Sequence, residues 1–392
     1  MTDIATLRAW WAHRQGLDGT HTGATARETL ATTGWARSVG GAAPYLGLFA
    51  RAGLRREQVD ADVAALAVHE LPSARGCTYV LPAADYAVGL TVGAAAPAAE
   101  VAAAAKHLDV PTDEVAGLCA AVAGALGDTP MDPAAIRAAT GDAVRDLGDA
   151  GRRRGVSTTL PLALGLLQAR GEIRRVPVNG RLDQQRYGYV RWMAGPSPLD
   201  PDTADVELAR RYFRWAGPAS LKHFRWFSGF TATRAKAAIA HLDLVAVPGG
   251  TDLLLDAADS DEFAAFAPPT EPHYTLVAGI DGIHLLHRDV SRLLDPADAA
   301  RPVPAGKPGR NLGDEADPPT PVIVDRGRIV GLWEYDPEAG EIAYQLFVKQ
   351  DKALRAAIES TQDYARDQLG DVRSFGPDSP ASRAPRIAAL RG

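Results

Sequence analysis

Apolar residues recur at helical spacing along most of the chain, and short β-compatible segments follow the helical runs. Between residues 160 and 192, an apolar helical run ends at Gly171, a residue type that accepts the backbone conformation of a helix end. Two β-compatible segments, 172–178 and 186–192, follow and are separated by an Asn179-Gly180 turn. A winged helix ends in this way, with a helix followed by a hairpin. The pattern therefore predicts a winged helix over residues 111–196.

The same order of elements occurs twice more. Residues 1–83 contain helical runs, including one at 25–33 with the capping-box pair Thr25 and Glu28, and then β-like pieces at 68–71 and 77–81. Residues 203–256 contain helical runs and a short wing, after a Pro- and Asp-rich linker at 200–205. Residues 84–110 are Ala-rich and predict a helical connector.

Short alternating β segments dominate after residue 270. They predict a small β-barrel-like domain over 270–350, followed by a closing helix at 351–369 and an irregular tail, together 351–392. The predicted fold class is thus α+β, with three tandem winged-helix domains followed by a small C-terminal β-barrel-like domain.

Composition limits the class of protein and the cellular location that we expect. The chain has 392 residues, and 46% of them are hydrophobic, which is ordinary for a globular protein. The two cysteines, Cys77 and Cys119, have no zinc-ligand spacing, so we expect no metal, no disulfide and a cytoplasmic location. The N-terminus lacks a signal-peptide pattern, and no uninterrupted apolar run approaches the roughly 18–20 residues that span a bilayer. We therefore expect no membrane partner.

Positive charge is concentrated in two segments of an otherwise acidic chain. The net charge is −6, yet nine arginines lie between residues 152 and 191 against Glu172 and Asp183. Seven cations lie between residues 207 and 241 against Glu207 alone. Basic modules in an acidic protein indicate a polyanionic partner, and nucleic acid is the candidate that we consider. The alternative is that these arginines only solvate exposed surfaces.

Four segments carry a family resemblance: RGCTYVLPAADY (75–86), RRYFRWAGPASLKHFRWFSG (210–229), YTLVAGIDGIHLLHRD (274–289) and VIVDRGRIVGLWEY (322–335). In this order they resemble the AlkZ/YcaQ-type DNA glycosylases over nearly the whole length of the chain. The resemblance implies tandem winged helices with a C-terminal β domain. It also implies cleavage of the N-glycosidic bond of alkylated or crosslinked purine nucleotides, without a metal or redox cofactor.

The resemblance breaks at the catalytic motif. The family holds its hydrolytic water with a Gln-x-Gln or Gln-x-Asp motif. Aligned on Gly34 and on the Phe49-Ala50-Arg51 end of the following helix, the two motif positions fall on Ala36 and Ser38. No glutamine lies between Gln15 and Gln58, so the difference does not depend on register. Ala36 can form no side-chain hydrogen bond, and Ser38 is shorter than glutamine.

Three residues near this motif are candidates to take over the role of the missing glutamines: Ser38, Glu70 and His69. Glu70 is a candidate base or cation stabiliser, and His69 a proton carrier at neutral pH. Neighbouring residues on a strand point to opposite faces, so His69 and Glu70 are not expected to share one site. The alternative for Glu70 is an ordinary ion pair with Arg75 or contact with solvent across the hairpin.

DNA contacts are expected from basic side chains in every part of the chain. The candidates are Arg37, Arg51, Arg75, Arg152, Arg153, Arg154, Arg174, Arg175, Arg181, Arg186, Lys222, Arg225 and Arg288. Trp35 is a candidate for stacking on an unpaired base. Asp281, His284 and His287 lack the spacing of a metal site and are interpreted as a turn and a strand edge.

Two functional hypotheses follow from the sequence. The first is a monomeric DNA glycosylase with a rebuilt catalytic motif, acting on damaged double-stranded DNA. The second is a winged-helix DNA-binding protein that has lost catalysis and shields damage or regulates transcription. The loss of a polar side chain at Ala36 supports the second hypothesis, so the sequence leaves open whether the protein is an enzyme.

Overall fold

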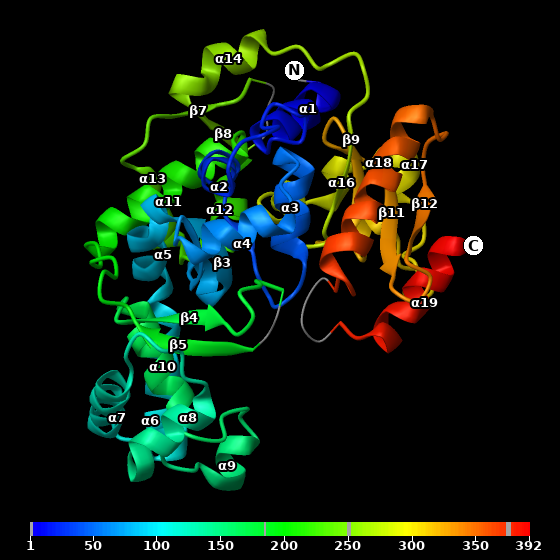
Figure 1. The fold of residues 1–392 in the computed structure, drawn as a ribbon. Helices are drawn as coiled ribbons and strands as arrows, with labels where there is room; N and C mark the ends of the chain where they lie inside the picture. Colours follow the sequence, from blue (N-terminus) through cyan, green and yellow to red (C-terminus); the bar gives the residue numbers. More distant parts are fainter. Residues whose placement is uncertain (1–2, 184–185, 249–251, 374–377) are drawn as a thin grey trace.

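The computed structural model describes residues 3–183, 186–248, 252–373 and 378–392. Figure 1 shows the N-terminal helices between residues 201–256 and the C-terminal sheet, while residues 112–169 form a lobe at one end of the molecule.

The first unit is built around a three-stranded antiparallel sheet. Its elements are α2 (Ala26–Thr33), β1 (Ala36–Arg37), α3 (Ala43–Ala52), α4 (Arg56–Ala64), β2 (Val68–Pro72) and β3 (Thr78–Pro82), and the strand order is β1-β3-β2. Thr25 and Glu28 form the expected capping box, and Gly53 ends α3 in a left-handed conformation. The short strand β1 is not apparent in the hydrophobic pattern, and it brings the altered motif onto the sheet.

The second unit forms the lobe and its hairpin. The connector is α5 (Tyr86–Gly93) and α6 (Ala95–Leu108), and the unit contains α7 (Thr112–Ala125), α8 (Pro133–Thr140), α9 (Gly148–Arg152), α10 (Leu160–Ala169), β4 (Ile173–Pro177) and β5 (Tyr187–Arg191). Asp132 caps α8 through its side chain, and Gly171 has the positive φ expected after α10. Strands β4 and β5 pair as an antiparallel hairpin.

The third unit repeats the plan of the first. It contains α11 (Pro201–Ala216), β6 (Ala219–Ser220), α12 (Leu221–Ser228), α13 (Ala232–Ile239), β7 (Leu244–Ala246) and β8 (Leu253–Asp256), with strand order β6-β8-β7. The predicted linker at 200–205 is wrong. Asp200 accepts the hydrogen bond of an N-cap and Pro201 occupies the first turn, so these residues start a helix.

The C-terminal part has an open sheet where a barrel-like domain is predicted. Strands β9 (Tyr274–Val277), β10 (Val322–Asp325), β11 (Arg328–Asp336) and β12 (Glu341–Leu346) pair in the order β12-β11-β10-β9, and the described residues form no closed barrel. Helix α18 (Lys352–Tyr364) contacts the edge strands β9 and β12, while α19 (Pro380–Arg391) contacts β11 and β12. Helices therefore cover the sheet without closing it (Figure 1).

The tail is helical, contrary to the sequence prediction. Ser379 caps α19 and Pro380 occupies its first turn, where proline is tolerated. Pro385 lies inside the helix, but the buried side chains of Ile387 and Leu390 hold the helix in a core that also contains C-terminal sheet residues.

The hydrophobic cores join the predicted units. Helix α1 (Ile4–Arg14) places Trp10 and Trp11 in a core that also contains residues of the third unit and of the C-terminal sheet. The two indole N–H groups donate to the carbonyl oxygens of Gly217 and Pro218, at 2.8 and 3.0 Å. This satisfies both buried donors and attaches α1 to the third unit.

One helical segment resembles a membrane span by composition. Residues Ala83–Leu108 include a window with a mean hydropathy of 1.4, and 44% of that window is buried inside the protein. The segment contributes Val88, Leu90 and Val101 to hydrophobic cores, which accounts for its apolar character.

Candidate functional site

The β1-β3-β2 sheet separates the candidate residues into two sets. Ala36 and Glu70 both pair with Val80 of the central strand, so they share one face with Ser38 at the end of β1. Arg37 and His69 lie on the opposite face. The sequence argument that separates His69 from Glu70 agrees with this register.

Ser38 and Glu70 form a direct contact. The Ser38 hydroxyl donates to Oε1 of Glu70 at 2.5 Å, and the Ser38 backbone N–H donates to the carbonyl of Thr78 at 3.0 Å. The two side chains belong to nearly inaccessible residues, since Ser38 is 1% and Glu70 4% exposed. A short contact between a hydroxyl and a carboxylate is a charge-assisted hydrogen bond, which fixes both groups.

The β4–β5 hairpin covers this pair. Arg175 of β4 places Nη2 3.5 Å from Oε2 of Glu70, and the Tyr187 hydroxyl donates to Oε1 at 3.4 Å. The Arg175 guanidinium also lies 4.7 Å from the Tyr187 ring centroid. Burial raises the pKa of Tyr187, so its hydroxyl stays protonated at neutral pH. We call Ser38, Glu70, Arg175 and Tyr187 the buried polar cluster.

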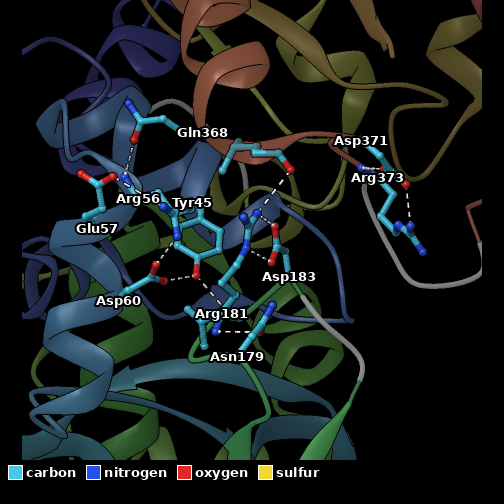
Figure 2. A network of polar contacts seen from close by, with 12 residues as sticks. Tyr45, Arg56, Glu57, Asp60, Asn179, Arg181, Asp183, Gln368, Asp371 and Arg373 are labelled. Atoms are coloured by element: carbon cyan, nitrogen blue, oxygen red, sulfur yellow. Dashed lines mark hydrogen bonds and ion pairs between the residues drawn. The ribbon is translucent and has the colours of Figure 1, made fainter. Parts of the chain in front are cut away.

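Polar contacts hold the loop of this hairpin against two other parts of the chain (Figure 2). The Tyr45 hydroxyl accepts the backbone N–H of Leu182 at 2.9 Å and donates to Asp60 of α4. Arg181 pairs with Asp183 and also donates to the carbonyl of Leu369 at 3.3 Å. We call these contacting groups the hairpin clasp, which consists of Tyr45, Asp60, Arg181, Leu182 and Asp183. The clasp fixes the hairpin above the buried polar cluster.

His69 is isolated from that cluster. Its ring packs edge-on against Tyr86 and Trp192, and neither ring nitrogen has a hydrogen-bond partner among the described residues. Burial, together with Arg174 and Arg175, lowers the pKa of His69 to about 3. The imidazole is therefore neutral at pH 7 and is not poised to carry a proton there.

A second feature lies beyond the opposite face of the sheet, between the first, third and C-terminal parts. It is a cleft of about 800 Å³ whose lining includes Arg37, Arg75, Trp226, Arg288 and Arg386. We call it the arginine cleft. Val39 and Arg37 line it while Ser38 does not, as strand alternation requires. The cleft and the buried polar cluster are therefore two separate sites.

The predicted DNA-contacting residues do not form one surface. The exposed ones are Arg75, Arg152, Arg153, Arg154, Arg186, Lys222 and Arg225, and the half-buried ones are Arg37, Arg174, Arg175, Arg181 and Arg288. Helix α9, which ends at Arg152, lies at the far end of the lobe from α12, which carries Lys222 and Arg225 (Figure 1). Arg152 also pairs with Asp149 on its own helix.

Arg51 is removed from any DNA surface by an internal ion pair. Its guanidinium donates to both carboxylate oxygens of Asp281, at 2.8 and 2.7 Å, and Arg51 is only 6% exposed. The arginine lowers the pKa of the Asp281 carboxyl against the opposing effect of burial. Asp281 also caps the short helix α15 (Gly282–Leu285), so the predicted strand edge here is wrong.

Two further interpretations change with the structure. Trp35 is 6% exposed and donates its N–H to Asp85 at 2.7 Å, so it is a core residue and has no free ring face for a base. Glu70 pairs with Ser38 and Arg175 and not with Arg75. Arg75 instead stacks on Trp226.

Sequence reasoning missed Tyr187, Trp226 and Arg386. Tyr187 belongs to a segment that alternates clearly, but nothing local indicates that its hydroxyl meets a strand over one hundred residues earlier. Trp226 stands between Arg225 and Phe227 in a basic helix, a combination of cation and aromatic that could have drawn attention to it. Arg386 lies in the tail that was expected to be irregular.

No metal site is found in the part of the chain that the structure describes, since it holds no group of three or more His, Cys, Asp or Glu side chains suited to an ion. Cys77 and Cys119 are both free thiols.

Comparisons with known proteins place this fold and site in context. The sequence model of a family described as "DNA glycosylase AlkZ-like" matches residues 29–366. The structure is similar to that of the Streptomyces sahachiroi DNA glycosylase AlkZ, with a TM-score of 0.72 and 20% sequence identity over 94% of this chain and 98% of that chain. No curated protein matches the chain. Because the family match spans most of the sequence, this chain belongs to the AlkZ-like DNA glycosylase family.

Proposed function

We propose that this protein binds duplex DNA containing a modified purine and hydrolyses the N-glycosidic bond of that nucleotide. Membership in the AlkZ-like DNA glycosylase family supports DNA as the partner. The observation that carries the proposed chemistry is the Ser38–Glu70 hydrogen bond, because it puts a carboxylate beside the position where the family resemblance expects the water-holding motif.

In this proposal Glu70 replaces the missing glutamines. Oε1 of Glu70 accepts from Ser38, while Oε2 accepts no hydrogen bond from the described residues and lies 3.5 Å from Nη2 of Arg175. Once Arg175 moves aside, Oε2 orients a water molecule. The water adds to the anomeric carbon as the bond to the base nitrogen breaks. One water proton passes to Glu70 and then to solvent, because an N7- or N3-alkylated purine is cationic in the nucleotide and leaves as a neutral base. The carboxylate also stabilises the cationic sugar that develops in the transition state.

Access to this site requires the β4–β5 hairpin to move aside. Arg175 and Tyr187 cover the pair, and the hairpin clasp holds them in place. Binding to DNA would supply the phosphates that compete for Arg175 and the other hairpin arginines. We further infer that the repeated helix-and-sheet units are winged helices, three in number, and that the protein acts as a cytoplasmic monomer without a cofactor.

A second candidate function is DNA binding without chemistry. The burial of Ser38 and Glu70 favours it, because a pair that is 1% and 4% exposed is also what a purely structural hydrogen bond requires. Such a protein would shield or sense damaged DNA, or regulate transcription, through its basic surfaces.

Base release separates the two functions. The substrate is a duplex carrying N7- or N3-alkylated purines, mixed with enzyme in excess so that one turnover is observed. Release that disappears in Ser38→Ala or Glu70→Gln supports hydrolysis by the buried polar cluster. Steeply salt-dependent binding without release from wild type supports the second function. Failure to bind any duplex at low salt contradicts both.

A further inference from the structure

The arginine cleft is not used by the proposed hydrolysis. Ser38 and Glu70 lie on the other face of the β1-β3-β2 sheet, and neither lines the cleft. Its volume of about 800 Å³ falls within the range of ligand-binding pockets. Its walls come from three parts of the chain, so the fold creates the cleft and no single unit contains it.

Two arginines with strained backbone conformations stack on the ring of Trp226 in this cleft. Arg75 has φ 59° and Arg288 has φ 45°, both in the left-handed region that non-glycine residues seldom adopt. The guanidinium carbons lie 4.5 Å and 4.4 Å from the ring centroid of Trp226. Backbone strain of this kind concentrates at ligand-binding positions, where the surrounding structure maintains it.

The cations of the cleft are only partly neutralised. Arg288 pairs with Asp317 at 3.1 Å, and Arg386 pairs with Glu334 at 3.0 Å. Arg37 and Arg75, which belong to the first unit, have no carboxylate partner within the described ranges. One wall of the cleft therefore carries two uncompensated guanidinium groups.

Several buried polar atoms in the cleft residues are without hydrogen bonds from the described protein. They are Nε of Arg37 and Nε1 of Trp226, both donors, and Oδ2 of Asp378, an acceptor. Buried polar groups are nearly always paired, so unpaired ones in the residues of a cleft indicate a polar ligand. Such a ligand would offer acceptors to the cationic wall and donors to the acidic side.

We propose that the arginine cleft is a second nucleic-acid site, which takes one unpaired nucleotide of a DNA strand together with its phosphate. Arg37 and Arg75 bind the phosphate oxygens, for which the planar guanidinium is well suited. The base stacks on the exposed guanidinium of Arg75, and an exocyclic amino group donates to Asp378. This site goes beyond the proposed hydrolysis, since it requires no bond cleavage.

The test measures binding by calorimetry, with a 5′-phosphorylated single-stranded tetramer of deoxyadenylate, dAMP and deoxyadenosine as probes. We expect the tetramer to bind most tightly and deoxyadenosine, which lacks the phosphate, most weakly. Arg75→Gln and Arg37→Gln should each weaken tetramer binding by about tenfold, because each removes a hydrogen-bonding cation. Arg137→Gln, an exposed arginine on α8 in the lobe that is not among the candidate DNA contacts, is the matched control and should bind as wild type does.

The proposal is overturned if none of the probes binds, or if Arg137→Gln weakens binding as much as Arg75→Gln. Tighter binding of dAMP than of the tetramer would assign the cleft to a free nucleotide and also overturn it. Circular dichroism shows whether each variant is folded. Glu70→Gln should bind the tetramer normally, so the cleft is tested independently of base release.

Discussion

At the scale of single residues, burial lowers the pKa of His69 and so makes the stability of the fold depend on pH. Its folded pKa of about 3 lies below the usual 6.5, so the unfolded chain takes up a proton below pH 6.5 that the folded chain excludes until about pH 3. Stability therefore falls as the pH drops through this window. The contribution from this one group is up to about 1.4 kcal/mol per pH unit.

We expect His69→Phe to remove that contribution. Because neither ring nitrogen has a hydrogen-bond partner in the part of the chain that the structure describes, a phenyl ring of similar shape loses no such bond and keeps the contacts with Tyr86 and Trp192. Relative to wild type, the variant should be more stable by about 1–2 kcal/mol at pH 5. Chemical denaturation at pH 5 and pH 7 measures this, with the exposed His241→Phe as the control. An unchanged pH dependence in His69→Phe would contradict the assignment.

Arg51 is expected to act in stability and not in DNA binding. Arg51→Met leaves the Asp281 carboxylate buried without its bidentate partner, which should lower the free energy of unfolding by about 3–5 kcal/mol. Thermal and denaturant unfolding measure the loss. Arg55→Met, at an exposed arginine nearby, should cost little. If the two variants unfold alike, the Arg51–Asp281 pair does not have the structural role assigned to it.

At the scale of elements, the hairpin clasp holds the loop of the β4–β5 hairpin against the first unit and the C-terminal part. Leu182 is fully buried, and its N–H is accepted by the Tyr45 hydroxyl (Figure 2). Tyr45→Phe leaves that donor unpaired, at a cost of about 1–3 kcal/mol. Hydrogen exchange of the Leu182 amide should accelerate by about tenfold or more. Tyr274→Phe, which loses a hydroxyl on an exposed contact, should not change it; equal acceleration in both variants would exclude the clasp.

The elements also show what the sequence could predict. Helices with caps were predictable, as at Thr25 and Asp132, because capping is a local signal. The first turn of the helix at Pro201 and the whole helix beginning at Pro380 were missed because proline was interpreted as a breaker, although it is also favoured in a first turn. The strands β1 and β6 have two residues each, which is too short for an alternating pattern.

The site was predictable residue by residue but not as an arrangement. Ser38 and Glu70 were both candidates, yet their contact depends on the strand order β1-β3-β2, which places the last strand of the unit between the other two. Arg175 is predicted to contact DNA, and the sequence does not show that it also lies beside Glu70, because the hairpin of the second unit folds onto the sheet of the first. Contacts between units leave no local pattern in a sequence.

At the scale of the whole molecule, the first unit is where the proposed functions meet. One face of its sheet holds the buried polar cluster, and residues of the other face line the arginine cleft. The third unit and the C-terminal part complete the cleft, while the second unit supplies the cover over the cluster. DNA bound to this unit would have the proposed hydrolytic site on one side of the sheet and the proposed nucleotide-binding site on the other.

The most direct test of the account is single-turnover base release from a duplex with an N7-alkylated purine, comparing wild type, Glu70→Gln and Glu57→Gln. Glu57 is exposed on α4, so the same substitution there is the matched control. We expect wild type and Glu57→Gln to release base at similar rates, and Glu70→Gln to be slower by about 100-fold or more, the contribution of a general base. Equal release by Glu70→Gln, or none by wild type, would contradict catalysis by this cluster.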